Sequence, residues 1–227
     1  DADATANAVN ENAANGTTVG ITVVASDADA TTNTVTYSLT DNAGGRFGIN
    51  ATTGVVTVAD GTLLDRETAV SHNITVRATS ADGSTADTVF TININDVNEF
   101  SVGAVTDTNA AVNTVAEDAT IGTTVGITAF ASDADATTNT VTYTLASDAG
   151  GLFAINGTTG IVTVAAGLDF ETTTSHSITV RATSVDGSFS TQAFTINVTD
   201  VNESGVTAIS DTDAASDYVL ENSVNGT

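Results

Sequence analysis

The sequence predicts an all-β protein made of tandem antiparallel β-sandwiches. Apolar and polar residues alternate in short runs rich in Thr, Val and Ile, which is the period of a half-buried strand. Turn signals containing glycine separate these runs, and no segment of helix length shows a helical period. Seven or so short strands in about 100 residues indicate a sandwich of immunoglobulin-like type.

Four runs in the first half of the chain each have one apolar face. Their alternate residues are predicted to point inward: Val19, Ile21, Val23 and Ala25; Val35, Tyr37 and Leu39; Ile74, Val76 and Ala78; and Phe90, Ile92 and Ile94. Turns are predicted at Ala43–Gly45, Thr53–Gly54 and Ala81–Ser84. Each unit can therefore bury its own core, at a size where single domains are stable.

The chain repeats itself. The run at Ala25–Tyr37 returns unchanged at Ala131–Tyr143, an offset of 106 residues, and later landmarks return at an offset of 104. This predicts two complete modules, at 1–99 and 100–203, and the start of a third at 204–227, where Leu220–Asn222 echoes Val9–Glu11. We expect the chain to be part of a longer array, because the terminal repeat of an array normally differs from the others.

Acidic residues dominate the charge. The chain has 28 Asp and Glu against four arginines and no lysine, and a formal net charge of −24. This charge opposes binding to nucleic acid and anionic lipid, and it favours cations. Charged residues are only 14% of the chain and apolar residues 41%, so the chain is expected to fold rather than to be a disordered acidic tail.

Two absences exclude further classes. Without cysteine the chain can form neither disulfides nor thiol centres. It contains no signal peptide and no apolar stretch long enough to span a bilayer, so we expect any export signal or anchor to lie outside it.

Acidic residues gather at four places in each module. These are a Glu after the first strand, an Asp-x-Asp after the second, an Asp-x-Glu in mid-module, and a DVNE sequence at the module end. The residues are Glu11, Glu117 and Glu221; Asp27, Asp29, Asp133 and Asp135; Asp65, Glu67, Asp169 and Glu171; and Asp96–Glu99 and Asp200–Glu203. A lone Asp is usually a solvated charge, but a set that repeats in one order indicates ligands.

This order resembles cadherin repeats, in particular the cadherin-like repeats of large bacterial surface proteins. The resemblance rests on Glu, DAD, TGxVxV, LDRE and DxN(D/E) in succession, and it covers essentially the whole chain. It implies non-enzymatic extracellular modules whose junctions bind Ca²⁺.

The resemblance also implies which residues hold the calcium. For the complete junction they are Glu11, Asp65, Glu67, Asp96, Asn98, Glu99, Asp133 and Asp135, with a backbone carbonyl from Asn139. Half of a junction at the downstream end comprises Glu117, Asp169, Glu171, Asp200, Asn202 and Glu203, and half of one at the upstream end comprises Asp27, Asp29 and Asn33. The two incomplete sets are expected to bind calcium weakly.

The chemistry of these residues agrees with that implication. Calcium takes six to eight oxygen ligands, and seven carboxylates belong to the complete junction. Two like charges about 4 Å apart repel by roughly 4 kcal/mol at an effective dielectric constant of 20. The cluster should spread apart unless cations neutralise it, so calcium should stiffen the junction.

Some positions depart from the family pattern. After the linker Asn98 the family often has Asp-Asn-x-Pro, whereas Glu99-Phe100-Ser101 follows here and the chain has no proline. Ser80 and Ser184 occupy what is usually an Asp position; Asp82 and Asp186 lie two residues on and could replace it only if the loop were displaced. The number of ions per junction stays open.

Catalysis is disfavoured. His72 and His176 lie at equivalent strand starts beside a serine, but no third partner or oxyanion glycine motif accompanies them. Asp-x-Asp can bind a metal nucleotide, yet no phosphate-binding glycine loop is present. We therefore expect structural histidines and no enzyme.

We favour one function, and two alternatives stay open. The first is a calcium-rigidified extender in a bacterial adhesin, which suits a chain with eight Phe, three Tyr and no Trp, most of them in strand patterns. The second is homophilic or glycan adhesion by the modules themselves, and the third is a subunit of an extracellular filament or sheath. Expected partners are calcium ions, neighbouring repeats and, for adhesion, like modules of other chains. Nucleic acid and membrane insertion are not expected.

Overall fold

The computed structural model describes residues 1–203, 205–206, 210 and 212. Within these residues the regular structure is β-sheet apart from one short 3₁₀ helix, η1 (Gly61–Leu63), which confirms the predicted all-β class. The strands are β1 (Ala8–Asn10), β2 (Thr18–Thr22), β3 (Val35–Asp41), β4 (Phe47–Ile49), β5 (Val55–Val58), β6 (Ser71–Ser80), β7 (Thr85–Asn95), β8 (Thr106–Asp107), β9 (Thr114–Ala116), β10 (Thr124–Phe130), β11 (Val141–Ser147), β12 (Phe153–Ile155), β13 (Ile161–Val164), β14 (Ser175–Ser184) and β15 (Phe189–Thr199).

Each module consists of two sheets. The first module has sheets in the order β1-β7-β6-β3 and β2-β5-β4, and the second has β11-β14-β15-β9 and β12-β13-β10-β8. The predicted antiparallel sandwich is confirmed, with one parallel pair in each module, β1 with β7 and β9 with β15. A parallel pair cannot be joined by a tight hairpin, and here most of a module lies between its two strands.

Each module also has its own core. In the first, Ile21 and Val56 from one sheet and Ile74 and Ile92 from the other are almost completely buried in one cluster. These contacts follow the predicted alternation of inward and outward residues. The second module has an equivalent cluster, to which Val102 and Val105 are added.

The two histidines pack beside core aromatics. The His72 ring centroid lies 6.3 Å from that of Phe47, and the His176 centroid lies 5.7 Å from that of Phe153. His72 is in β6 and His176 in β14. Their surroundings agree with the predicted structural role.

Three phenylalanine side chains are more exposed to solvent than the strand patterns predict. Phe100, Phe130 and Phe189 are 45%, 52% and 57% exposed. Phe130 and Phe189 do lie in strands, but at a strand end in each case. The guanidinium carbon of Arg181 lies 3.9 Å from the Phe189 ring centroid, so this ring is partly covered by a cation–π contact.

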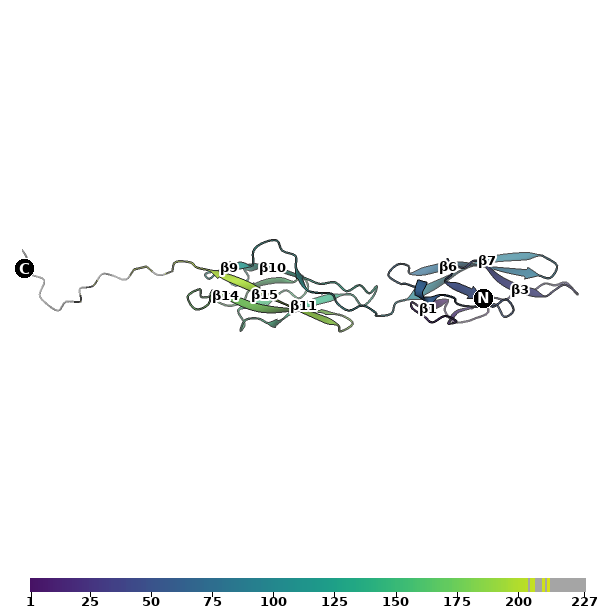
Figure 1. The fold of residues 1–227 in the computed structure, drawn as a ribbon, viewed down its shortest axis with the longest axis horizontal. Helices are drawn as coiled ribbons and strands as arrows, with labels where there is room; N and C mark the ends of the chain where they lie inside the picture. Colours follow the sequence, from purple (N-terminus) through teal and green to yellow (C-terminus); the bar gives the residue numbers. More distant parts are fainter. Residues whose placement is uncertain (204, 207–209, 211, 213–227) are drawn as a thin grey trace, which may run out of the picture.

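The modules lie end to end in an elongated chain (Figure 1). The boundaries at 99/100 and 203/204 stay predictions, and most of the predicted third segment, Glu221 included, lies outside the described residues. In the part of the chain that the structure describes, no helix has the length and apolar character needed to cross a membrane.

Candidate metal centre at the module junction

Three acidic segments meet where the first module joins the second. Asp65-Arg66-Glu67 lies between η1 and β6, the linker Asp96–Glu99 follows β7, and Asp133–Asp135 lies between β10 and β11. The two modules lie end to end (Figure 1), and hydrogen bonds from Ala136 to Glu67 and from Thr137 to Asp96 show that residues far apart in sequence are neighbours at the junction.

Glu11 joins two of these segments. Its side chain is only 1% exposed, its Oε2 accepts a 2.5 Å hydrogen bond from Arg66 N, and its Oε1 accepts a 2.7 Å bond from Val97 N. Glu117 repeats the arrangement with Phe170 N and Val201 N, each at 2.7 Å. Because both modules have this pairing, we infer that this Glu orients the mid-module loop and the linker together.

Backbone donors of the second module reach carboxylates of the first. Ala136 N donates to Glu67 Oε1 at 2.8 Å, and Thr137 N donates to Asp96 Oδ2 at 3.1 Å, a contact to which the Thr137 hydroxyl adds. In the linker, the amides of Glu99 and Phe100 donate to Asp135 Oδ1 at 3.1 and 3.2 Å. These bonds fix the two modules against the linker.

The carboxylates form two compact groups at this junction. Ligand atoms of Glu11, Glu67 and Glu99 lie within 4.8 Å of one another, and so do those of Asp133, Asp135 and Asp186. Such spacing is too close for like charges without compensation, and it suits carboxylates that share a cation.

Several of these oxygens have no donor. Asp96 Oδ1, Asp133 Oδ2 and Asp135 Oδ2 are buried and make no hydrogen bond. The nearby guanidinium of Arg66 donates instead to the carbonyls of Val70 and Ile94. Among the described residues the ion pair found is Arg77 with Asp87, which involves no predicted ligand. An all-oxygen set with buried, unpaired atoms fits a hard divalent cation such as calcium.

The surroundings of two junction glutamates, Glu67 and Glu99, raise their pKa values. Partial desolvation raises the pKa of the Glu67 carboxyl, and the charge of Glu11 adds to the effect. Desolvation also raises the pKa of Glu99, with further contributions from Glu11, Glu67, Asp135 and Asp96. The smaller contributions, from neighbouring carboxylates, reflect the negative charge concentrated where these residues meet.

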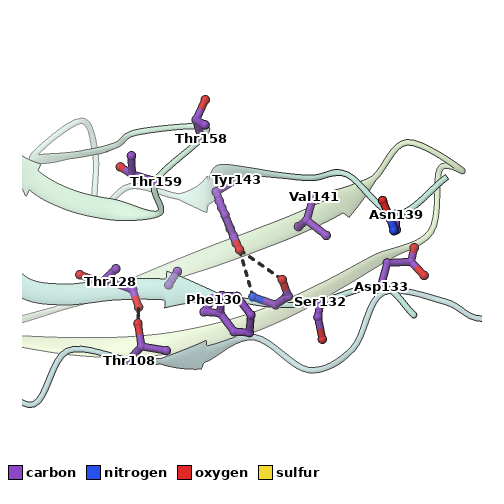
Figure 2. Close-up of a pocket in the computed structure, with 12 residues that line it drawn as sticks. Thr108, Thr128, Phe130, Ser132, Asp133, Asn139, Val141, Tyr143, Thr158 and Thr159 are labelled. Atoms are coloured by element: carbon purple, nitrogen blue, oxygen red, sulfur yellow. Dashed lines mark hydrogen bonds between the residues drawn. The ribbon is translucent and has the colours of Figure 1, made fainter. Parts of the chain in front are cut away.

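Not every predicted ligand joins a group. Asp65 is exposed, and both its oxygens accept 2.8 Å bonds from Thr68, which lowers its pKa. Asn98 is exposed in the linker, and its side chain makes a small contribution to the lowered pKa of Asp186. Asn139 lines a hollow of the second module together with Asp133, at the same end of it (Figure 2).

A tyrosine holds the backbone that leads to the Asp-x-Asp segment. Tyr143 Oη accepts a 3.0 Å bond from Ala131 N and donates to Ala131 O at 3.4 Å (Figure 2). In the first module Tyr37 Oη accepts from Ala25 N at 2.9 Å. Each tyrosine therefore anchors the chain two residues before the first Asp of the pair.

The two ends of the chain contain partial versions of the junction. Upstream, ligand atoms of Asp27, Asp29 and Asp82 lie within 4.8 Å of one another. Asn33 is exposed, and its N–H donates to Thr31 O at 3.1 Å. Downstream, Glu117, Glu171 and Asp200 form a group of the same size. All six predicted downstream residues line one hollow: Glu117, Asp169, Glu171, Asp200, Asn202 and Glu203. A hydrogen bond from Glu203 to Glu117, followed by their charge repulsion, raises the pKa of Glu203.

The predicted set omitted Asp82 and Asp186. Each joins the Asp-x-Asp group of its own module. Hydrogen bonds from Ser188, and smaller contributions from Asn98 and Ser184, lower the pKa of Asp186. The available signal was the Asp-Gly-Ser turn that both modules share.

Comparison with known proteins agrees with this architecture. The family model described as the cadherin domain matches residues 6–95 and 112–199. Human Protocadherin Fat 4 is 39% identical over 183 residues, which cover 78% of the chain and 4% of that protein. The Drosophila melanogaster protocadherin-like wing polarity protein stan is 34% identical over 219 residues, covering 91% of the chain and 6% of that protein.

The solved structures give the same result. The crystal structure of mouse Cadherin-23 EC22-24 has a TM-score of 0.71 and 30% identity, with 87% of this chain and 64% of that chain covered. The chain belongs to the cadherin family, whose domains are extracellular adhesion modules that work in tandem and bind calcium between domains. These relatives are animal proteins, so they do not support the predicted bacterial origin, and the chain spans only a few per cent of the curated relatives' length.

Proposed function

We propose that the modules are calcium-rigidified extenders of an extracellular adhesion protein. The convergence of carboxylates from three segments, with buried oxygens that have no hydrogen-bond donor, carries this proposal. The proposed ligands are those predicted from the sequence: Glu11, Asp65, Glu67, Asp96, Asn98, Glu99, Asp133 and Asp135, with the Asn139 carbonyl.

The hydrogen bonds indicate a separate role for each of two carboxylates. Glu11 orients the mid-module loop and the linker, and Asp135 accepts from two linker amides. Bound calcium would neutralise the repulsion among these carboxylates. Movement of one module relative to the other would then separate ligands from the ion, so bending at the linker is opposed.

The end sets have the same proposed chemistry with fewer ligands. Asp27, Asp29 and Asn33 would meet a preceding module, and the downstream six would meet a following one. Since part of each shell comes from this chain alone, we expect weaker binding at the ends than at the complete junction.

A calcium titration tests the proposal. Thermal melting and the maximum particle dimension from small-angle scattering are measured in EDTA, in calcium up to about 10 mM and in magnesium, because extracellular modules bind calcium at about 0.1–1 mM. Calcium should raise the melting temperature and give a longer, narrower particle, whereas magnesium should do much less. A parent chain that melts and scatters identically in EDTA and calcium would overturn the proposal.

Direct adhesion by the modules is the second candidate. Exposed Phe100, Phe130 and Phe189 favour it, because a passive spacer has no need of exposed aromatics. Concentration-dependent association of the chain in calcium, lost when these residues become serine, would support it. The filament subunit and the bacterial adhesin both stay predictions that rest on the sequence.

A further inference from the structure

The turn between β14 and β15 brings a third carboxylate to the Asp-x-Asp pair. Asp186 lies in this turn, with a ligand atom within 4.8 Å of those of Asp133 and Asp135. Asp133 is 9% exposed and Asp135 is fully buried, and Oδ2 of each has no hydrogen-bond partner. Buried carboxylate oxygens without a donor are unfavourable, and a third nearby negative charge makes them more so. A cation among the three carboxylates would remove both penalties.

The turn is held so that Asp186 stays in this position. Its Oδ1 accepts a 2.7 Å bond from Ser188 N, while Gly187, with φ of 93°, donates its N–H to Ser184 O at 3.0 Å. On the other side, Ser188 Oγ accepts a 3.0 Å bond from Val102 N, just beyond the linker. The turn thus uses Oδ1 of Asp186, and no backbone N–H of the described residues donates to its Oδ2.

Ser184 cannot supply the same charge. It ends β14 and is only 4% exposed, and its hydroxyl donates a 2.8 Å bond to Thr138 O. A neutral hydroxyl already donating to a carbonyl contributes no negative charge to the site. Asp186 is therefore the residue of this turn that can complete the carboxylate set.

The first module repeats the arrangement. Asp82 groups with Asp27 and Asp29 within 4.8 Å, and its Oδ1 accepts from Ser84 N at 2.8 Å. Ser80 here contacts Asp27 directly through its hydroxyl. The Asp-x-Asp runs of the two modules are identical and their turns differ only at Ala81 and Val185, so the same three carboxylates meet in both modules.

We propose that Asp186 is a direct ligand of the cation held by Asp133 and Asp135, and that Asp82 has the same role beside Asp27 and Asp29. The proposal rests on the calcium junction proposed above. It adds a carboxylate from the β14–β15 turn, so the second module would bind the ion through two separate loops.

The test compares Asp186→Asn with Asp148→Asn in the full chain. Asp148 is a matched control, because it also caps a turn, accepting from Gly151 N at 2.9 Å, but lies in none of the carboxylate groups. Asparagine can still accept from Ser188 N, so Asp186→Asn removes the charge and keeps the turn. Calcium alone is titrated by calorimetry, and the amide NMR signals of Asp135, Thr137 and Ser188 report the junction site.

We expect Asp186→Asn to weaken calcium binding at these amides by about tenfold or more, with Asp148→Asn equal to the parent. In EDTA Asp186→Asn should melt no lower than the parent, because it removes one like charge from the group. Parental affinity in Asp186→Asn, together with lost affinity in Asp133→Asn, would overturn the role of Asp186 and leave the calcium junction standing. No calcium response in the parent would overturn both. If Asp186→Asn also melts lower in EDTA, Asp186→Ser, which keeps an acceptor for Ser188 N, decides in the same way.

Discussion

The backbone N–H of Ala136 in the second module donates a 2.8 Å hydrogen bond to Oε1 of Glu67 in the first. The neighbouring Thr137 N–H donates to Asp96 Oδ2 at 3.1 Å. The modules therefore touch through neutral backbone donors on negative carboxylates. These donors, like the amide of Glu99 that donates to Asp135, carry no positive charge to balance the carboxylates, so the rigidity of the junction should depend on a cation.

Replacing Glu67 should loosen the junction without unfolding either module. Glu67→Ala removes the Ala136 contact and one carboxylate of the Glu11 group. We expect small-angle scattering in calcium to show a broader distribution of particle lengths than in the parent, with both modules melting normally. Glu171→Ala is the matched control at the downstream end, and it should leave the distribution unchanged. Equal rigidity of Glu67→Ala and the parent would contradict the prediction.

Replacing Glu11 should instead destabilise the first module itself. Glu11→Ala leaves Arg66 N and Val97 N without their carboxylate acceptor. Loss of two such bonds should lower the free energy of unfolding by about 2–4 kcal/mol. Urea unfolding in EDTA measures this, so that calcium binding does not contribute. Glu99→Ala is the control, because the Glu99 side chain is exposed. Equal free energies of unfolding for Glu11→Ala and Glu99→Ala would contradict this structural role of Glu11.

Tyr143→Phe should cost more stability than Tyr37→Phe. Both changes remove a hydroxyl that accepts a backbone N–H, from Ala131 in one case and Ala25 in the other. Tyr143 is 7% exposed and Ala131 is buried, whereas Tyr37 and Ala25 are only partly buried. Water can replace the lost acceptor in the first module but not in the second, where about 1–2 kcal/mol should be lost. Unfolding of the two variants in EDTA provides the comparison, and equal losses would contradict it.

Gly160→Ala should be much more damaging than Gly122→Ala. Both glycines have positive φ, 70° and 93°. A Cβ at Gly160 would lie 2.0 Å from Ala129 O, whereas none of the surrounding atoms lies within 4 Å of a Cβ at Gly122. Gly122→Ala should therefore lower the free energy of unfolding only by the left-handed backbone penalty of about 1–2 kcal/mol. Gly160→Ala must also displace the strand that ends near the Asp-x-Asp segment, and thermal melting should show a clearly larger loss.

His72 should make the first module less stable in mild acid. Burial, with a smaller contribution from the charge of Arg46, lowers its pKa from the usual 6.5. The unfolded chain therefore takes up a proton more readily than the folded module. The free energy of unfolding should keep its full value above pH 6.5 and decrease as the pH drops below that value toward the pKa of His72 in the folded module. In His72→Gln this part of the pH dependence of melting should disappear, and an unchanged profile would show that other groups cause it.

The sequence alone was sufficient for the fold class and for the family. Alternation at Val19, Ile21 and Val23 predicts a strand with one buried face, since burial in a sheet depends mainly on local period. The local pattern could not predict the parallel pairing of β1 with β7, because that pairing joins strands more than 80 residues apart. Repetition of the acidic segments indicated a ligand set, and the assignment of individual ligands remains a prediction.

Tertiary structure decided which carboxylates become neighbours. Asp186 and Asp133 are separated by more than 50 residues, and whether they meet depends on the turn at Gly187 and on how β14 and β15 leave the sheet. The backbone partners of Glu11, at Arg66 and Val97, are equally remote in the chain. The sequence determined which chemical groups were available, whereas the distances among them follow from strand register and loop conformation, which no local pattern encodes.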